Sequence, residues 1–197
     1  PLRGAGANEN NLALVKTGPG TLTISSANNT YAGGTVIVQG AGFPNAGLVL
    51  GAHNALGVGP LTVGTEATAG GGARLRMAGF NQTVSALASG TVGVRVIENN
   101  GAADSLLTVN QAGDTAYTGI LRDRTQSNAA FVGSLGLTKS GVGTLALGGD
   151  NVHTGATTLA GGTLEASRLG NAGIERVIDT TAASNQITVN DATGLEV

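Results

Sequence analysis

The chain has 197 residues, a formal net charge of −2 and no cysteine, which excludes a disulfide framework and any thiolate metal site or thiol nucleophile. It contains 34 glycines without the strict every-third spacing of collagen, and 41% of its residues are hydrophobic, too many for a disordered chain. Charged residues make up 11% and form no basic cluster, so we expect no nucleic-acid partner. No signal peptide and no run of about 18 apolar residues is visible, so a signal or an anchor would have to lie outside this segment.

The first half of the chain alternates short strands with glycine-rich and asparagine-rich turns. Residues 1–11 read as an entering turn, and residues 21–24 alternate aliphatic and threonine side chains, as a one-sided strand does. Residues 25–34 have the composition of a turn. In the strand expected at 35–39 we place Val36 and Val38 inward. Residues 40–47 are expected to form a surface loop.

The second half repeats the same elements. Residues 61–63, 107–109 and 187–189 are three versions of one strand, and residues 73–77 and 92–96 alternate in polarity. Glycine interrupts every candidate helix, so we expect almost no helix. The period-two pattern predicts that these side chains face the core: Leu22, Ile24, Leu75, Met77, Leu107, Val109, Leu145, Leu147, Ile187 and Val189.

One stretch occurs twice, at residues 14–40 and 137–162. Lys16 aligns with Lys139, the glycines and the Thr-Leu pair that follow also align, and Asn28 aligns with Asn151. The offset is 123 residues (137 − 14) through the first strand and 122 (153 − 31) from Tyr31 onward, where His153 stands opposite. A glycine-punctuated repeat of alternating polarity is typical of a solenoid.

The repeated pattern K-x-G-x-G-T-L, followed by asparagine and an aromatic residue, resembles the passenger-associated transport repeat of bacterial autotransporter proteins. The repeats fall at about 12–42 and 135–165, residues 50–63 and 106–121 resemble the segments between such repeats, and the match is weak from about Gly170. The second copy departs from the family at His153, where an aromatic residue is usual. The resemblance implies a right-handed parallel β-helix within a secreted or surface-displayed passenger. Its implied location is extracellular or at the outer membrane, and its implied partner is an outer-membrane barrel of the same polypeptide.

A coil is also favoured by the turns. Asn100-Gly101 is the one two-residue hairpin signal of its kind, whereas a sandwich of antiparallel strands would use many. With about 20–25 residues per turn, we expect eight or nine stacked turns. We treat residues 1–197 as one all-β segment of a longer protein. We expect it to continue as β-helix or to dock end to end with another copy, because neither end resembles a cap.

The sequence indicates no catalytic, cofactor-binding or metal-binding residue. His53 and His153 have no sequence neighbours typical of a metal site or a catalytic base, and Tyr31 occupies the position equivalent to His153, so both histidines are expected to be structural. Asp123 is expected to be a solvated loop charge. Gly148-Gly149-Asp150 departs from the calcium-binding nonapeptide after its glycines. The carboxylates are dispersed along the chain: Glu9, Glu66, Glu98, Asp104, Asp114, Asp123, Asp150, Asp179 and Asp191 among them.

Two sets of basic residues remain. Lys16 and Lys139 are expected to be solvated charges in turns. Arg76 and Arg95 lie 19 residues apart (95 − 76), close to one turn, and both are expected to point outward. Like charges at stacked positions repel, so either Glu66 or Glu98 lies between them or the pair binds an anion.

These features favour a structural, non-enzymatic stalk that spaces a distal domain from the cell and assists export by folding outside first. The alternative is an adhesin-type module that binds a host or matrix glycan or protein through loops such as 40–47 or 122–134. A polysaccharide-degrading enzyme is a third hypothesis, and it would need a cluster of acids that the sequence does not suggest.

Overall fold

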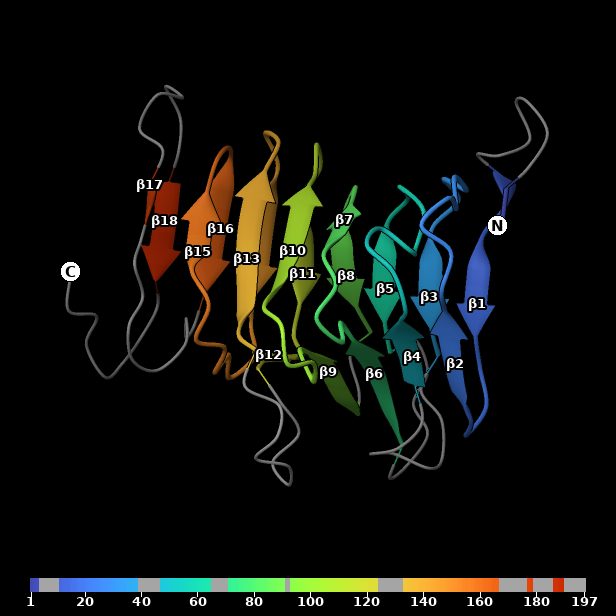
Figure 1. Cartoon of the computed structure of the whole chain (residues 1–197). Helices are drawn as coiled ribbons and strands as arrows, with labels where there is room; N and C mark the ends of the chain where they lie inside the picture. Colours follow the sequence, from blue (N-terminus) through green and yellow to red (C-terminus); the bar gives the residue numbers. More distant parts are fainter. Residues whose placement is uncertain are drawn as a thin grey trace.

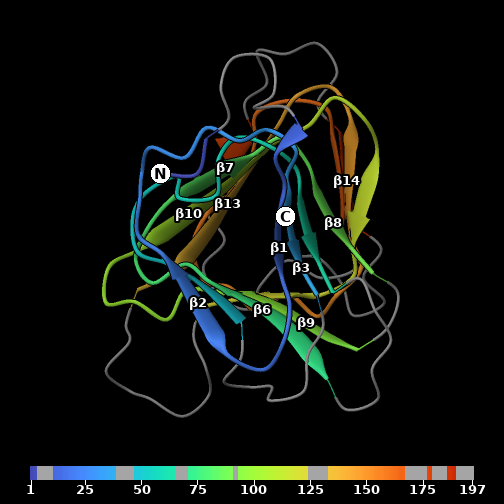
Figure 2. The same cartoon turned by 90° about the vertical axis from the view of Figure 1, so that its right-hand side faces the viewer.

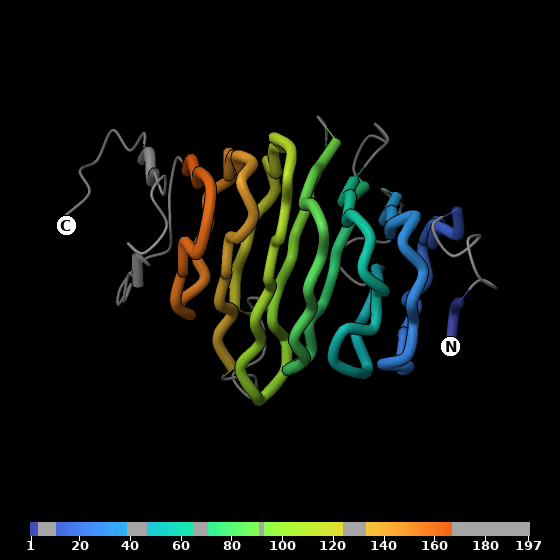
Figure 3. The backbone as a smooth tube through the Cα atoms, turned by 90° about the horizontal axis from the view of Figure 1, so that it is seen from above, coloured from blue at the N-terminus to red at the C-terminus, as the bar shows by residue number. Residues whose placement is uncertain are grey.

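The computed structural model describes residues 1–3, 11–38, 47–64, 71–90, 93–123 and 133–166, and the backbone of two further strands at 177–178 and 186–189. Short strands stack along one axis in these residues (Figures 1 and 3), and no helix among them is long and apolar enough to cross a membrane. All paired strands are parallel.

The strands form three faces of a coil with a roughly triangular cross-section (Figure 2). The first face carries β1 (Leu14–Lys16), β3 (Thr35–Ile37), β5 (Leu61–Val63) and β8 (Leu87–Ser89), and continues with β11 (Thr115–Tyr117), β14 (Thr144–Leu147), β16 (Thr163–Ala166) and β18 (Gln186–Val189). The second face carries β2 (Thr21–Ile24), β4 (Gly47–Leu50), β6 (Gly72–Arg76), β9 (Val94–Glu98) and β12 (Ile120–Arg122). The third face carries β7 (Gln82–Val84), β10 (Ser105–Asn110), β13 (Leu135–Ser140), β15 (Thr157–Leu159) and β17 (Val177–Ile178).

The chain visits the faces in a fixed order, first, second and third, and then begins the next turn. Viewed from its N-terminal end in Figure 2, it runs clockwise while moving away from the viewer, so the coil is right-handed. The expected right-handed parallel β-helix is therefore confirmed. The turns are less regular than expected, because aligned strands are separated by as few as 19 residues (163 − 144) and as many as 30 (145 − 115).

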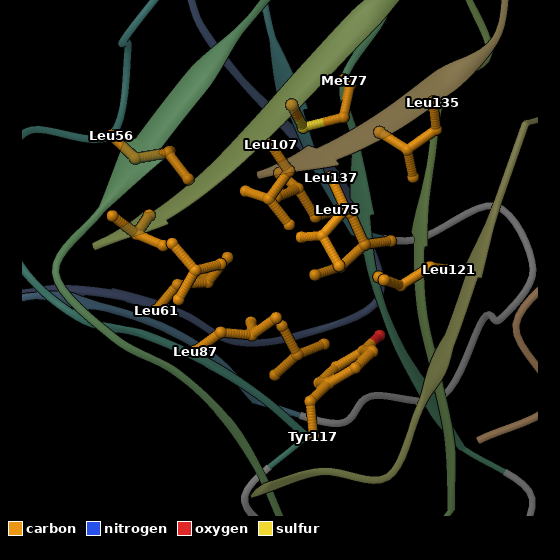
Figure 4. Close-up of a cluster of buried hydrophobic side chains, with 14 of the residues drawn as sticks. Leu56, Leu61, Leu75, Met77, Leu87, Leu107, Tyr117, Leu121, Leu135 and Leu137 are labelled. Atoms are coloured by element: carbon orange, nitrogen blue, oxygen red, sulfur yellow. The ribbon is translucent and has the colours of Figure 1, made fainter. Parts of the chain in front are cut away.

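The core is built from ladders of aliphatic side chains that stack from one turn to the next. Leu48, Leu75, Ile97 and Leu121 occupy matched positions on four successive strands of the second face, and each is at most 1% exposed. Figure 4 shows Leu75 and Leu121 among the leucines of the other two faces, with the ring of Tyr117 at the edge of the cluster. Full burial of each such side chain contributes about 1.5–3 kcal/mol.

Most of the predicted inward residues are buried: Ile24, Leu75, Met77, Leu107, Val109, Leu145 and Leu147. Leu22 is only partly buried against the core, in the first strand of its face. Ile187 and Val189 lie where side chains are outside the described residues.

The prediction that Val36 and Val38 face inward is wrong by one residue. Thr35 and Ile37 are each 1% exposed, whereas both valines are half-buried. Thr35 can point inward because its hydroxyl is hydrogen-bonded to the hydroxyl of Tyr31, at 2.7 Å. A run of three apolar residues, 36–38, left the register of this strand open in the sequence.

Candidate functional site

The two repeat copies fold into equivalent units, and each unit contains a buried ring bonded to a threonine four residues later. The hydroxyl of Tyr31 lies 2.7 Å from Thr35 Oγ1, and Nε2 of His153 lies 2.9 Å from Thr157 Oγ1. The rings are 0% and 2% exposed, respectively. The structure thus confirms the alignment of Tyr31 with His153.

An asparagine two residues before each ring joins neighbouring turns. Asn151 accepts a hydrogen bond at Oδ1 from the backbone N–H of Leu121 in the preceding turn, at 3.0 Å. In the first copy the same role belongs to Asn29, which accepts from the backbone N–H of Leu2 and donates to the carbonyl of Ala55 at 2.7 Å. Asn29 and Asn151 are both buried, whereas Asn28 is exposed. The expected pairing of Asn28 with Asn151 is therefore wrong, and the extra turn residue of the first copy lies before Asn29.

The repeated lysines are buried, so the expectation of solvated charges is wrong. Lys139 is 0% exposed and its ammonium donates to the carbonyls of Ser140, Gly141 and Gly161, at 2.8, 2.9 and 3.1 Å. Lys16 is 8% exposed and donates to the carbonyls of Thr17 and Gly18. The ammonium has three donors and the tight glycine turn presents several carbonyls, so a lysine at this position satisfies groups that would otherwise be buried without partners.

His153 is held in its neutral form. Burial lowers the pKa of His153 below 6.5, while the carboxylate of Asp123 and the backbone of Leu121 act in the opposite direction. Its Nδ1 is buried and makes no hydrogen bond of normal geometry. Burial likewise raises the pKa of Tyr31, so both rings are uncharged at neutral pH.

His53 is exposed, and it is placed by two contacts. The backbone N–H of Asn81 donates to Nδ1 of His53 at 3.0 Å, and the ring meets Phe80 edge to face with centroids 5.3 Å apart. These contacts join one turn to the next.

Three aspartates bind backbone N–H groups of the following turn. Asp104 accepts from Ser134, Asp114 accepts from Thr144, and Asp123 accepts from Leu135 and Thr154, all at 2.7–2.9 Å. The asparagines at 54 and 81 make the same kind of bond, to the N–H groups of residues 83 and 106. The expectation that Asp123 is a solvated loop charge is wrong, since its carboxylate closes two backbone groups.

The main charged cluster of the described residues is one carboxylate surrounded by three guanidinium groups. Glu98 is 0% exposed and lies 3.2 Å from Arg74, 3.4 Å from Arg76 and 2.7 Å from Arg122. Strand pairing places Arg76, Glu98 and Arg122 side by side on β6, β9 and β12. Burial lowers the pKa of Arg74 to about 10, an effect that Glu98 opposes and the other two arginines reinforce.

The expected stack of Arg76 on Arg95 is absent. Arg95 pairs with Ala73, and its guanidinium donates to the carbonyl of Gly90 at 2.8 Å. Glu98 does lie beside Arg76, 22 residues later (98 − 76), as one of the two expected acids. The sequence gave no sign that Arg74 would be buried, because it alternates with apolar neighbours as an outward residue would. Glu66 lies outside the described residues, as do Glu9, Asp179 and Asp191.

Within the described ranges, no group of three or more histidine, aspartate or glutamate side chains is arranged to hold a metal ion. Two open grooves occur there. One, of about 410 Å³, lies beside the first turn and is lined by Leu2, Leu14, Leu22 and Ile24 among others. The other, of about 450 Å³, lies on the outer side of the third face, along Leu106, Gly136, Thr138 and Thr158. Of the loops considered for binding, residues 40–46 and 124–132 lie outside the described residues.

Comparison with known proteins places the repeat units in a family. The passenger-associated transport repeat matches residues 14–41 and 137–166, the two units described above. An autotransporter adhesin of Brucella suis biovar 1 (strain 1330), BmaC, is 33% identical over 126 residues. That alignment covers 57% of this chain and 4% of the adhesin, so the chain spans a small part of the length of this relative. No solved structure gives a significant match. The repeats and the relative together indicate a location at the cell surface or outside the cell.

Proposed function

We propose that this segment, an autotransporter-type passenger coil carrying two transport repeats, is a structural stalk without catalytic activity. Its role is to assist export by folding turn by turn outside the cell and to space a distal region from the surface. Its partners are the adjoining turns of the coil and the outer-membrane domain of the same polypeptide, with end-to-end association of copies as a further possibility.

The observation that carries this proposal is that the repeat units complete their neighbours. Asn29 joins residues of three successive turns through one side chain, and Lys139 reaches from its own turn to Gly161 of the next. Each finished turn therefore presents donors and acceptors that only the next turn satisfies. The free energy released by adding a turn favours movement of the chain in one direction, with no need for a nucleotide site.

The described carboxylates support a structural role. Asp104, Asp114 and Asp123 are occupied by backbone N–H groups, and Glu98 is occupied by arginines. A glycosidase needs two carboxyl groups that face one sugar across about 5–10 Å, one of them free to donate a proton. Residues committed to joining turns serve that chemistry poorly.

The test is export of the parent protein. Deletion of residues 137–165 should lower the amount of passenger folded at the cell surface, measured by protease resistance of intact cells. Lys139→Met should do the same to a smaller extent, because it keeps the chain length and removes three hydrogen bonds. Thr138→Ala, on the outward side of the same strand, is the matched control and should leave display unchanged. Any distal activity per folded molecule should be preserved in all three proteins.

An adhesin-type binding module is the second candidate, because the relative from Brucella suis is an adhesin. The groove along Leu106 and Thr138 offers a surface for it. Unchanged display after the deletion, with loss of adhesion to host cells or matrix, would favour this function over the stalk.

A further inference from the structure

We infer that His153 makes the second repeat unit sensitive to acid, so that the coil around β13–β15 opens at mildly acidic pH while the first unit stays closed. This inference rests on the geometry of the two units and holds whether or not the segment assists export. The two units share one backbone arrangement, but one carries a phenol and the other an imidazole at the same buried position. Tyr31 remains neutral throughout the physiological pH range, whereas an imidazole is the side chain that gains a proton there.

The surroundings of His153 do not provide for a charged ring. The ring is 2% exposed, Nε2 is engaged with the hydroxyl of Thr157, and Nδ1 has no hydrogen-bond partner of normal geometry. A protonated imidazole would need an acceptor at each nitrogen, because both then carry a hydrogen. Placing an extra donor without an acceptor in a buried position is unfavourable.

Among the described residues, Asp123 at the end of β12 is the charged group that acts on the ring. Its Oδ1 accepts from the N–H groups of both Leu135 and Thr154, and its Oδ2 also accepts from Thr154. A shift of this carboxylate toward the ring would break those bonds. Lys139 of β13 directs its ammonium to the turn carbonyls at the far end of its strand, and the carboxylates of Asp150 and Glu165 are on the exposed side of the coil.

The sign of the pH effect follows from proton binding. Burial keeps the pKa of His153 in the folded chain below the value of about 6.5 expected when the unit is open. Between these two values the open unit binds a proton that the closed unit does not, so protons favour opening. Stability of the second unit therefore falls as pH drops below 6.5 and levels off below the pKa of the folded chain. The protection of its amides should fall by up to about tenfold per pH unit inside this window.

The experiment is hydrogen exchange of the whole chain at pH 7.5 and pH 5.0, expressed as protection factors. We expect protection of residues 135–159 to fall at pH 5.0 more than that of residues 14–37. His153→Tyr should remove the difference, and Tyr31→His should create the same acid sensitivity in the first unit. Equal acid sensitivity of the two units in the unaltered chain would overturn the inference, as would a His153→Tyr protein that keeps the full effect.

A second measurement stands if a variant fails to fold. Titration of the imidazole by NMR in the unaltered chain should give a pKa for His153 below that of the exposed His53. A pKa of His153 above 6.5 would show that the folded unit accepts the proton readily, which contradicts the inference.

Discussion

The carboxylate of Glu98 lies 2.7 Å from the guanidinium of Arg122, although 24 residues separate them in the sequence. The two occupy paired positions on β9 and β12, and Arg76 occupies the matching position on β6. Charges of alternating sign thus stack across three turns, and Arg74 closes the cluster from two residues away. The arrangement fixes the relative register of these three turns, because a shift of one residue on any strand separates the charges.

We predict that Glu98→Gln is strongly destabilising. Removal of the carboxylate leaves Arg74, which is 2% exposed, and two further arginines without their common anion. Removing one partner of a buried ion pair costs about 3–5 kcal/mol. The loss should appear as a lower midpoint of denaturant unfolding. Glu165→Gln, an exposed carboxylate on β16, is the control and should shift the free energy of unfolding by less than about 0.5 kcal/mol. Equal effects of the two substitutions would mean that the arginines are solvated.

We predict that His153→Tyr is tolerated at pH 7.5, with a change of less than about 1 kcal/mol in the free energy of unfolding, because Tyr31 already fills the equivalent position and bonds to a threonine. His153→Ala should cost more, about 2–4 kcal/mol, since it leaves a cavity and an unpaired Thr157 hydroxyl. Both values can be read from chemical denaturation at that pH. A loss of several kcal/mol in the tyrosine variant would show that the two units differ in packing.

The sequence was sufficient to predict the coil and much of its core. The repeat of residues 14–40 at 137–162 showed a solenoid, and the alternation at Leu75 and Met77 identified the inward side. These features are local, because a side chain in a strand points to the same face as its neighbour two residues away.

Contacts between turns were harder to predict, because turn length varies. A constant period placed Arg95 against Arg76, whereas the longer path through the turn places Glu98 there. The burial of Lys139 was missed for another reason. Its partners are backbone carbonyls, which every sequence contains, so residue types alone give no sign of them. A lysine that recurs at the same repeat position before a G-x-G turn was the available signal.

We predict that Lys139→Met destabilises the chain by about 1–3 kcal/mol, the cost of leaving buried acceptors unsatisfied. Lys16→Met should cost less, because the Lys16 ammonium bonds to two carbonyls of its own turn and its side chain is slightly more exposed. Urea unfolding of both variants, followed by circular dichroism, tests the order. A larger loss at Lys16 would contradict the role assigned to the third carbonyl, at Gly161.

Asp104 gives a prediction on acid unfolding. Hydrogen bonds from the backbone N–H and the hydroxyl of Ser134 lower the pKa of Asp104 below its ordinary value of 3.8. The carboxylate therefore contributes stability that is fully present above pH 3.8 and is lost as pH falls through the lowered value. Asp104→Asn should retain most stability at pH 7, because the asparagine at position 81 makes the equivalent bond one turn earlier. The difference between the variant and the unaltered chain should shrink between pH 5 and pH 2.5. A constant difference over that range would show that the charge of Asp104 contributes nothing.

The last prediction concerns the spacing between turns. Gly149 packs so closely on the preceding turn that a Cβ atom there would collide with the carbonyl oxygen of Gly119. Backbone on both sides leaves no flexible side chain to move, so the turns would have to separate. We expect Gly149→Ala to destabilise the chain by about 1–3 kcal/mol, on the scale of overpacking in a core, and to lower the hydrogen-exchange protection of β12 and β14. Gly113→Ala is the matched control, since a Cβ atom at Gly113 meets no atom within 4 Å, and it should be neutral. Equal stability of the two alanine variants would mean that adjacent turns can separate without cost, which the ladder of parallel strands argues against.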